Sequence, residues 1–183
     1  TQINALTAFS SKNNKYINDW VNDILHSNTN INLKIAAAEY LVEIPNKSIL
    51  YLQKEIADTL NWRVRTILYS QAIQKGNKEI IDDSFSRYNK THNLYEKGML
   101  LESLGQLPGK KEWLKDQIME NDSIVSTYGM EAMVSLIKNS DHKALYAPYL
   151  FETIRSNHDA VVSLTALACR DSIFSDLIDV NLL

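Results

Sequence analysis

The sequence has few of the residues that interrupt or cross-link a chain. Its 183 residues include five glycines, three prolines and one cysteine, Cys169. A lone cysteine excludes an internal disulfide and fits a reducing compartment. The scarcity of glycine and proline, together with little strict apolar/polar alternation, leaves few of the turns and strands that a β-sandwich or barrel needs. These absences favour an all-helical chain.

Neither sign of charge dominates, and long apolar runs are missing. The 19 basic and 22 acidic residues are spread along the chain and give a formal net charge of -3. This excludes a strong overall attraction to nucleic acid or to anionic bilayers, although a local patch stays open. No run approaches the roughly 18 apolar residues of a membrane span, and the N-terminus has no signal-peptide pattern. We expect a cytoplasmic location, with an upstream signal peptide left open because the chain starts at Thr1.

The motifs of known catalytic and metal sites are also missing. HExxH, CxxC, GxSxG and glycine-rich phosphate loops are absent, and the four histidines fall at predicted turns. We therefore assign no catalytic residue, no metal ligand and no cofactor. His92 and Glu96 lie one helical turn apart, which would suit half of a metal or acid–base site. The interpretation we favour is a solvated helix start with a local ion pair, and Cys169 is expected in the core.

What the sequence does contain is a recurring helix pattern. Asn30 begins the stretch NINLKIAAAEYL, in which an Asx residue suited to N-capping precedes apolar residues at helical spacing. One helix position recurs at intervals of 31, 32, 29 and 36 residues, and we call it the column: Leu33, Val64, Glu96, Val125 and Val161. Three positions before it stand Asn30, Asn61, Asn93, Asp122 and His158, and eight positions after it stand Leu41, Ala72, Leu104, Met133 and Cys169. Caps and burial positions that recur together predict stacked helix pairs.

The pattern predicts the bounds of the helices. The second helices of the pairs are expected over 30–44, 61–76, 93–107, 122–137 and 157–170, and the first helices around 16–25, 47–60, 80–88, 113–118 and 140–154. Thr1 to Phe9 resembles a second helix without its partner, and residues 172–183 resemble a capping helix or the start of a sixth pair. We therefore expect residues 1–183 to be one helical repeat domain, a fragment of a longer chain that begins mid-repeat. Gly98 and Gly129 inside helices indicate close helix approach. Gly76 is expected to end the helix over 61–76 in the left-handed conformation, Pro108 and Gly109 are expected to break the helix over 93–107, and Trp113 is expected in the core.

These residues resemble HEAT repeats, whose second helix has a capping Asx, then Val-Arg, then a small-residue run ending in Glu-Ala-Leu-Gly. Residues 33–41 are similar throughout, Val64-Arg65 matches the start, and residues 102–105 and 131–133 match the end. The resemblance implies an all-α, right-handed α-α superhelix, a HEAT-like (armadillo-type) solenoid of about five helix pairs. The basic residue after the column is present in three repeats and is replaced by Ser126 and Val162 in the last two.

The candidate binding residues are four cations and a tryptophan: Lys34, Trp62, Arg63, Arg65 and Lys97. Second helices usually line the concave side of HEAT-like stacks, which would place a ladder of basic residues, interspersed with Glu39, Gln71 and Glu102, in a groove. Such a ladder suits an acidic helix or tail, or a few phosphates. The tryptophan, flanked by two arginines, could stack on a base or a peptide side chain. Alternatively it closes the turn while the arginines pair with Asp58 or another acid.

We expect a non-enzymatic protein-interaction or scaffolding domain that presents a curved helical surface to a protein or peptide partner, which could be the rest of its own longer chain. A first alternative is a helical C-terminal accessory domain of a larger enzyme, because residues 95–101 loosely resemble that region of M1-type aminopeptidases. A second is a HEAT-like nucleic-acid-binding or alkylpurine DNA glycosylase domain. The isoelectric point near 5.8 argues against the second alternative.

Overall fold

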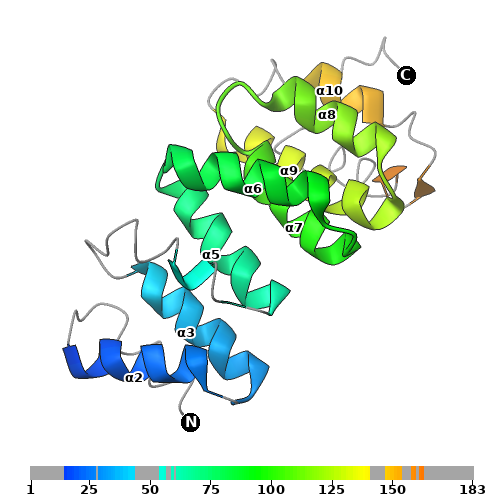
Figure 1. The fold of residues 1–183 in the computed structure, drawn as a ribbon. Helices are drawn as coiled ribbons and strands as arrows, with labels where there is room; N and C mark the ends of the chain where they lie inside the picture. The colour runs from blue at the N-terminus through cyan, green and yellow to red at the C-terminus, as the bar shows by residue number, and fades with distance from the viewer. Residues whose placement is uncertain are drawn as a thin grey trace. The chain divides into compact units, whose positions relative to one another are not determined.

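The protein is helical throughout the part of the chain that the structure describes (Figure 1). The structure, a computed structural model, describes residues 15–27, 29–43, 54–56, 59, 61–140, 147–153, 158–159 and 161–162. None of these residues lies in a β-strand, which confirms the all-α prediction for them. Predictions for residues 1–9, for most of 47–60, for Cys169 and for the tail lie outside the described residues.

Eight helices have defined bounds. They are α2 (Lys15–His26), α3 (Ile31–Glu43), α5 (Trp62–Gln74), α6 (Lys78–Lys90), α7 (Leu94–Gly105), α8 (Lys111–Glu120), α9 (Ser123–Asn139) and α10 (Ala147–Thr153). By its internal contacts the chain divides into two compact units, residues 1–84 and 85–183, and the boundary falls inside α6. None of the described helices is long and apolar enough to cross a bilayer.

The predicted N-caps start four of these helices. Asn30 Oδ1 accepts a hydrogen bond from the Asn32 amide at 2.8 Å, and Asn61 Oδ1 accepts one from the Arg63 amide at 2.9 Å. The equivalent bonds of α7 and α9 are made by the side chains of Asn93 and Asp122. Each cap satisfies an amide that has no partner inside its helix, and such a bond stabilises a helix by about 1 kcal/mol. The capping prediction is therefore confirmed in these four repeats.

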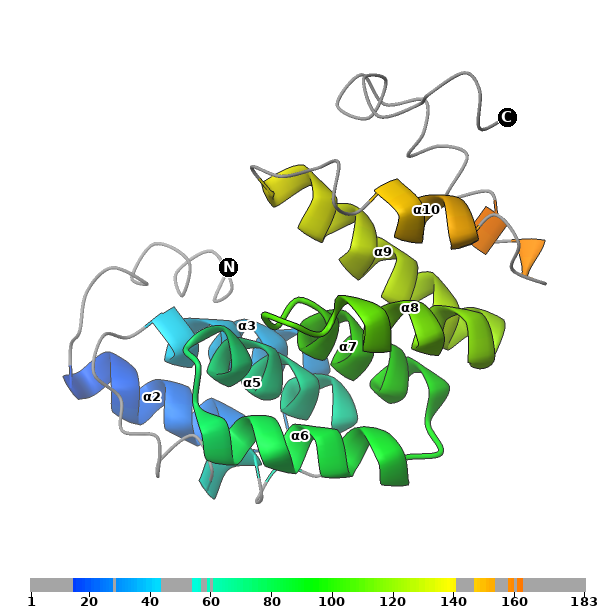
Figure 2. The ribbon, with the colours of Figure 1, turned by 90° about the horizontal axis from the view of Figure 1, so that it is seen from above.

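In the first unit, α2 and α3 form a hairpin, and α5 packs against α3 (Figures 1 and 2). The predicted stripe of α3 faces the core, since Ala37 and Leu41 are fully buried and Tyr40 nearly so. On α5 the buried residues recur at helical spacing, from the column to eight positions beyond it: Val64, Leu68 and Ala72. Gly76 follows α5 with φ 72°, the left-handed helix end that the sequence predicts.

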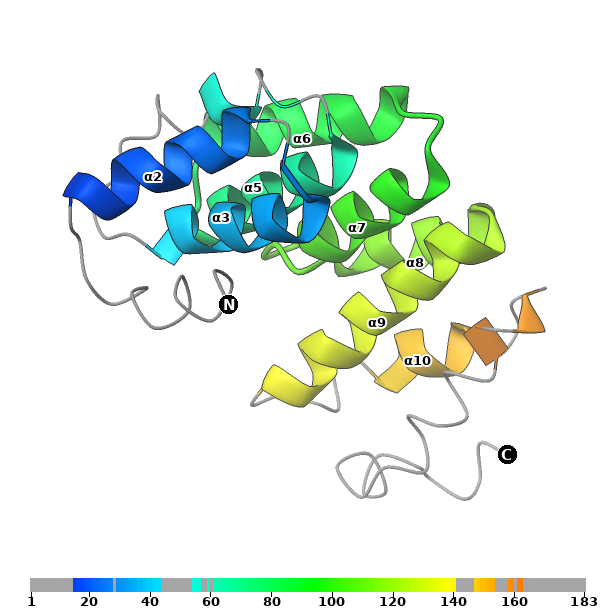
Figure 3. The ribbon, with the colours of Figure 1, turned by 90° about the horizontal axis from the view of Figure 1, so that it is seen from below.

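In the second unit, α7 packs along α9, α8 lies against α9, and α10 contacts α8 (Figure 3). The side chains that fill this core are fully buried aliphatic and methionine residues: Leu100, Leu101, Leu104, Leu114, Ile118, Met130 and Met133. Pro108 and Gly109 form the turn before α8, and Gly109 has φ 75°. The predicted break after α7 is therefore confirmed.

Two helical glycines allow this close packing. A Cβ built at Gly98 of α7 would lie within 3.0 Å of three ring atoms of Tyr128 on α9. A Cβ built at Gly129 of α9 would lie 2.8 Å from Ile118 and 2.9 Å from Leu101. Real Cβ atoms are essentially never found this close to a neighbour. The prediction of close helix approach at both glycines is confirmed.

We predict that Gly98→Ala lowers the free energy of unfolding. Alanine favours the helix by about 1 kcal/mol, but overpacking against a ring in a dense core costs about 1–3 kcal/mol. Urea unfolding followed by circular dichroism should therefore show a net loss of about 1 kcal/mol.

The control is the same substitution in a Tyr128→Ala background, where the ring is absent. There Gly98→Ala should be neutral or stabilising, because only the helix-propensity effect remains. A loss of equal size in both backgrounds would contradict the proposed contact.

Candidate functional site

The first group of candidate residues lies at the start of α5. The exposed Arg63 places its guanidinium carbon 5.3 Å from the centroid of the half-buried Trp62 ring. Such a cation–π contact in an exposed position contributes about 0.5–1 kcal/mol. It holds the arginine over an aromatic face beside the Asn61 cap, so the two residues form one small surface feature.

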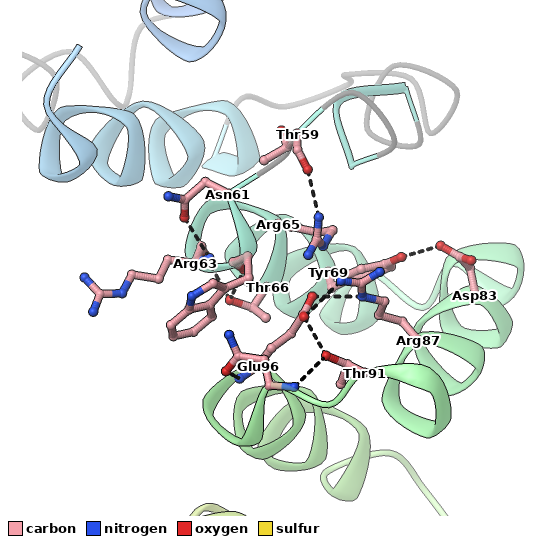
Figure 4. A network of polar contacts seen from close by, with 12 residues as sticks. Thr59, Asn61, Arg63, Arg65, Thr66, Tyr69, Asp83, Arg87, Thr91 and Glu96 are labelled. Carbon is pink, nitrogen blue, oxygen red and sulfur yellow. Dashed lines mark hydrogen bonds and ion pairs between the residues drawn. The ribbon is translucent and has the colours of Figure 1, made fainter. Parts of the chain in front are cut away.

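Arg65 makes a different contact from Arg63: it binds the backbone, whereas Arg63 lies over an aromatic ring. Its Nη1 donates a hydrogen bond of 2.9 Å to the Thr59 carbonyl, which ties α5 to the segment before it (Figure 4). Asp58, the acid suggested as a partner, lies outside the described residues. Arg65 is therefore held by a backbone carbonyl of this turn, and its part in binding stays a prediction.

The two lysines of the predicted ladder lie in different units. Lys34 is half-buried on α3 of the first unit, which also contains Trp62, Arg63 and Arg65. Lys97 belongs to the second unit, where its Nζ lies 5.0 Å from the centroid of the Tyr88 ring. Each unit thus carries its own cationic residues, and within each unit at least one cation is placed over an aromatic ring.

Glu96 departs from its sequence interpretation. Instead of a solvated helix start, it is a buried carboxylate with 1% exposure. Arg87 of α6 binds it through both branches of the guanidinium, Nε to Oε1 at 2.9 Å and Nη2 to Oε2 at 3.0 Å, and Thr91 donates to Oε2 at 2.7 Å (Figure 4). His92 is exposed and is not among these partners. The expected ion pair exists, but it is buried and its cation comes from the preceding helix.

The local sequence explains this geometry. A three-residue turn between α6 and α7 brings the last turn of one helix beside the first turn of the other. Thr91 Oγ1 also accepts from the Asn93 amide at 3.3 Å, so one hydroxyl links the cap to the carboxylate. A carboxylate in the first turn is further favoured by the helix dipole. The sequence does contain a signal for the Arg87–Glu96 pair. Glu96 stands in a column that otherwise holds leucine and valine, and Arg87 lies nine residues before it.

A second cluster in this unit combines aromatic rings with lysines, and we call its three rings the aromatic row. The Trp113 ring of α8 contacts Phe85 and Tyr88 of α6 edge-on, with centroids 5.1 and 5.5 Å away. The Lys110 Nζ lies 4.7 Å from the Phe85 centroid, while Lys97 covers Tyr88. Trp113, expected in the core, is only half-buried.

Tyr88 is fixed at its polar end as well. Its hydroxyl donates to Gln117 Oε1 at 2.7 Å and accepts from Asn121 Nδ2 at 3.3 Å. Burial raises the pKa of this phenol to about 12, with Glu120 adding to the rise and the Asn121 bond opposing it. The tyrosine is therefore a neutral, anchored residue at neutral pH and is poorly suited to act as a base.

An ion cluster joins α8 to α10. Lys115 Nζ lies 3.2 Å from Glu152, 3.4 Å from Glu112 and 3.7 Å from Asp116. Tyr149 donates to Glu112 Oε1 at 2.5 Å, and this hydrogen bond lowers the pKa of the Glu112 carboxyl. Three carboxylates share the single ammonium of Lys115, and its contact with Glu152 joins α8 to α10.

A repulsive pair of carboxylates lies on the second helices. Burial raises the pKa of Glu102 on α7, and the negative charge of Glu131 on α9 raises it further. Glu131 is exposed, whereas Glu102 is partly buried. The surface that the sequence presents as a mixed-charge groove therefore has an acidic portion here.

Among the described residues no three histidines, cysteines or acids gather as a metal ion would require. Comparison of the chain with protein-family models, curated proteins and solved structures finds no match. The resemblance to HEAT repeats thus depends on the residue pattern and on the helices that the pattern predicts.

We predict that Arg87→Met destabilises the protein by about 2 kcal/mol, because it leaves a buried carboxylate without its cation. Urea unfolding at neutral pH measures the change. Lys90→Met is the matched control, since it removes an exposed cation from the same helix and should change stability by less than about 0.5 kcal/mol.

The double variant Arg87→Met, Glu96→Leu tests the cause. It replaces the pair with apolar groups and should recover most of the loss, because no buried charge is left unpaired. A double variant as unstable as Arg87→Met alone would show that the destabilisation has another origin.

We predict that Glu102→Gln stabilises the protein at pH 7. A carboxyl whose pKa is raised in the folded state binds protons more readily when folded, so its contribution to stability falls as the pH rises above the unfolded-state value. The glutamine variant lacks this penalty. Its advantage should disappear below about pH 4, where the glutamate is protonated in both states.

Unfolding in urea across this pH range gives the measurement. Glu39→Gln, at an exposed position of α3, is the control and should show no such trend. Equal stability of the Glu102→Gln variant and the parent protein at pH 7 would contradict the prediction.

Proposed function

We propose that this chain is a HEAT-like, right-handed solenoid of about five helix pairs that acts as a non-enzymatic protein-interaction domain. The observation that supports it is the recurrence of one arrangement in four repeats. In each, an Asx residue caps a helix and the residue three positions later is buried. Repeats of this kind bury their core between neighbours and leave an extended surface for a partner.

The surface features favour binding over chemistry. The carboxylate of Glu96 and the hydroxyl of Tyr88 already make hydrogen bonds to other side chains that hold the helices together. The exposed Arg63, held over Trp62, and the half-buried Lys34 on the adjacent α3 are the residues we assign to partner contact in the first unit. An aromatic residue with a neighbouring arginine is typical of the residues that dominate binding energy in protein interfaces.

The test is capture of partners by the 183-residue chain from an extract of its own cells. The double variant Lys34→Glu, Arg63→Glu should lose a specific partner, because it reverses both charges without removing a core contact. Lys78→Glu, at an exposed position of α6, is the control and should capture the partner as the parent chain does. Circular dichroism establishes that all variants are folded.

Two results would contradict the assignment. Unchanged capture by the double variant would exclude the Lys34 and Arg63 surface. Recovery of only a catalytic domain from the same longer chain would favour the accessory-domain alternative, in which these helices shape access to an active site elsewhere.

A further inference from the structure

The aromatic row combines three packed rings with a lysine at each end. Phe85, Tyr88 and Trp113 form a continuous set of edge-on contacts between α6 and α8. A lysine covers a ring at each end of the set, Lys110 over Phe85 and Lys97 over Tyr88. Two cations therefore flank one aromatic surface, although they come from different segments of the second unit.

These two lysines differ from Arg87 and Lys115 of the same unit, which are paired with acids. Arg87 binds Glu96, and Lys115 lies within 4.0 Å of three carboxylates. Within the part of the chain that the structure describes, neither Lys97 nor Lys110 has a carboxylate within that distance. An ammonium has three donors, and contact with a ring face leaves donors available to an incoming acid.

Two rings of the aromatic row are partly exposed to solvent. Phe85 and Trp113 are half-buried, and so are both lysines, so part of each ring is accessible to a ligand. Partly exposed aromatic rings supply apolar contact area, while the flanking ammonium groups supply charge-assisted hydrogen bonds. The complementary ligand carries carboxylates separated by an apolar side chain.

The charge of the chain favours a peptide over nucleic acid. A uniformly charged polyanion such as nucleic acid would be repelled by the formal net charge of -3, whereas a short peptide needs to place only two carboxylates beside the two lysines.

We propose that the aromatic row with Lys97 and Lys110 is a docking surface for an acidic peptide segment of a protein partner. The inference rests on the proposed function, and it names a second contact surface and its ligand chemistry. The carboxylates of the segment bind the two ammonium groups, and an apolar side chain packs on Trp113.

The probe is a fluorescein-labelled synthetic peptide of repeated Asp-Leu-Glu triplets, titrated with the 183-residue chain at low ionic strength and followed by fluorescence anisotropy. Saturable binding that weakens with added salt is expected. Lys97→Ala, Lys110→Ala should weaken binding about tenfold, because two charge-assisted contacts are lost. Lys90→Ala, Lys138→Ala removes two exposed lysines of the same unit and should change the dissociation constant less than about twofold.

Several results would overturn the proposal. No binding of the peptide at low ionic strength excludes the surface, and equal weakening by both lysine pairs shows non-specific attraction. A labelled oligothymidylate that binds more tightly than the peptide, and loses affinity in the Lys97→Ala, Lys110→Ala variant, would assign the surface to nucleic acid. Circular dichroism of each variant excludes unfolding as the cause.

The assay also separates this inference from the proposed function. If partner capture depends on Lys34 and Arg63 while the peptide does not bind, the interaction domain stands and the acidic-peptide surface fails. If neither lysine pair nor the Lys34→Glu, Arg63→Glu variant affects capture, the proposed function itself fails.

Discussion

Four described helices, α3, α5, α7 and α9, share one short relation in the sequence, a polar cap followed three residues later by a buried side chain. The cap satisfies amides that have no partner inside the helix and so fixes where the helix starts, and the buried residue marks the face that turns toward the core. Asn61 and Val64 show it in α5, and Asp122 and Val125 show it in α9. With start and face fixed together, the remaining apolar residues are buried by helical periodicity alone.

One repeat keeps the relation but changes its chemistry. At Glu96 the buried position holds a charge, and it is tolerated because Arg87, Thr91 and the start of α7 surround the carboxylate. Replacing both charged residues by apolar ones need not weaken such a site, so stability alone does not explain the pair. Its geometric effect is to link the last turn of α6 to the first turn of α7 within the second unit, since a two-branched guanidinium contact accepts little displacement.

The structure shows which features were accessible from the sequence. Caps, helix bounds and close glycines follow from local rules, and Asn93, Gly76 and Gly98 were identified by those rules alone. Burial of Glu96 was missed because helical periodicity assigns a glutamate near a helix start to solvent, and its partner lies across a turn. The row of Phe85, Tyr88 and Trp113 was also inaccessible, because its contacts join helices whose residues are some 25 positions apart and no spacing rule links them. Binding by Lys34, Trp62, Arg63, Arg65 and Lys97 stays a prediction.

The contact between Gly98 and Tyr128 has a consequence for how such a chain can evolve. Positions equivalent to Gly98, two residues after the column, hold Ile35, Thr66, Thr127 and Ser163. Each of these has a Cβ and atoms beyond it, and a Cβ at Gly98 would already lie within 3.0 Å of the Tyr128 ring. Deleting or duplicating a whole repeat would therefore place the wrong neighbour beside this tyrosine. Although the pattern recurs along the sequence, the helix that packs against Tyr128 is not interchangeable with the others, because a side chain at the position of Gly98 meets the ring.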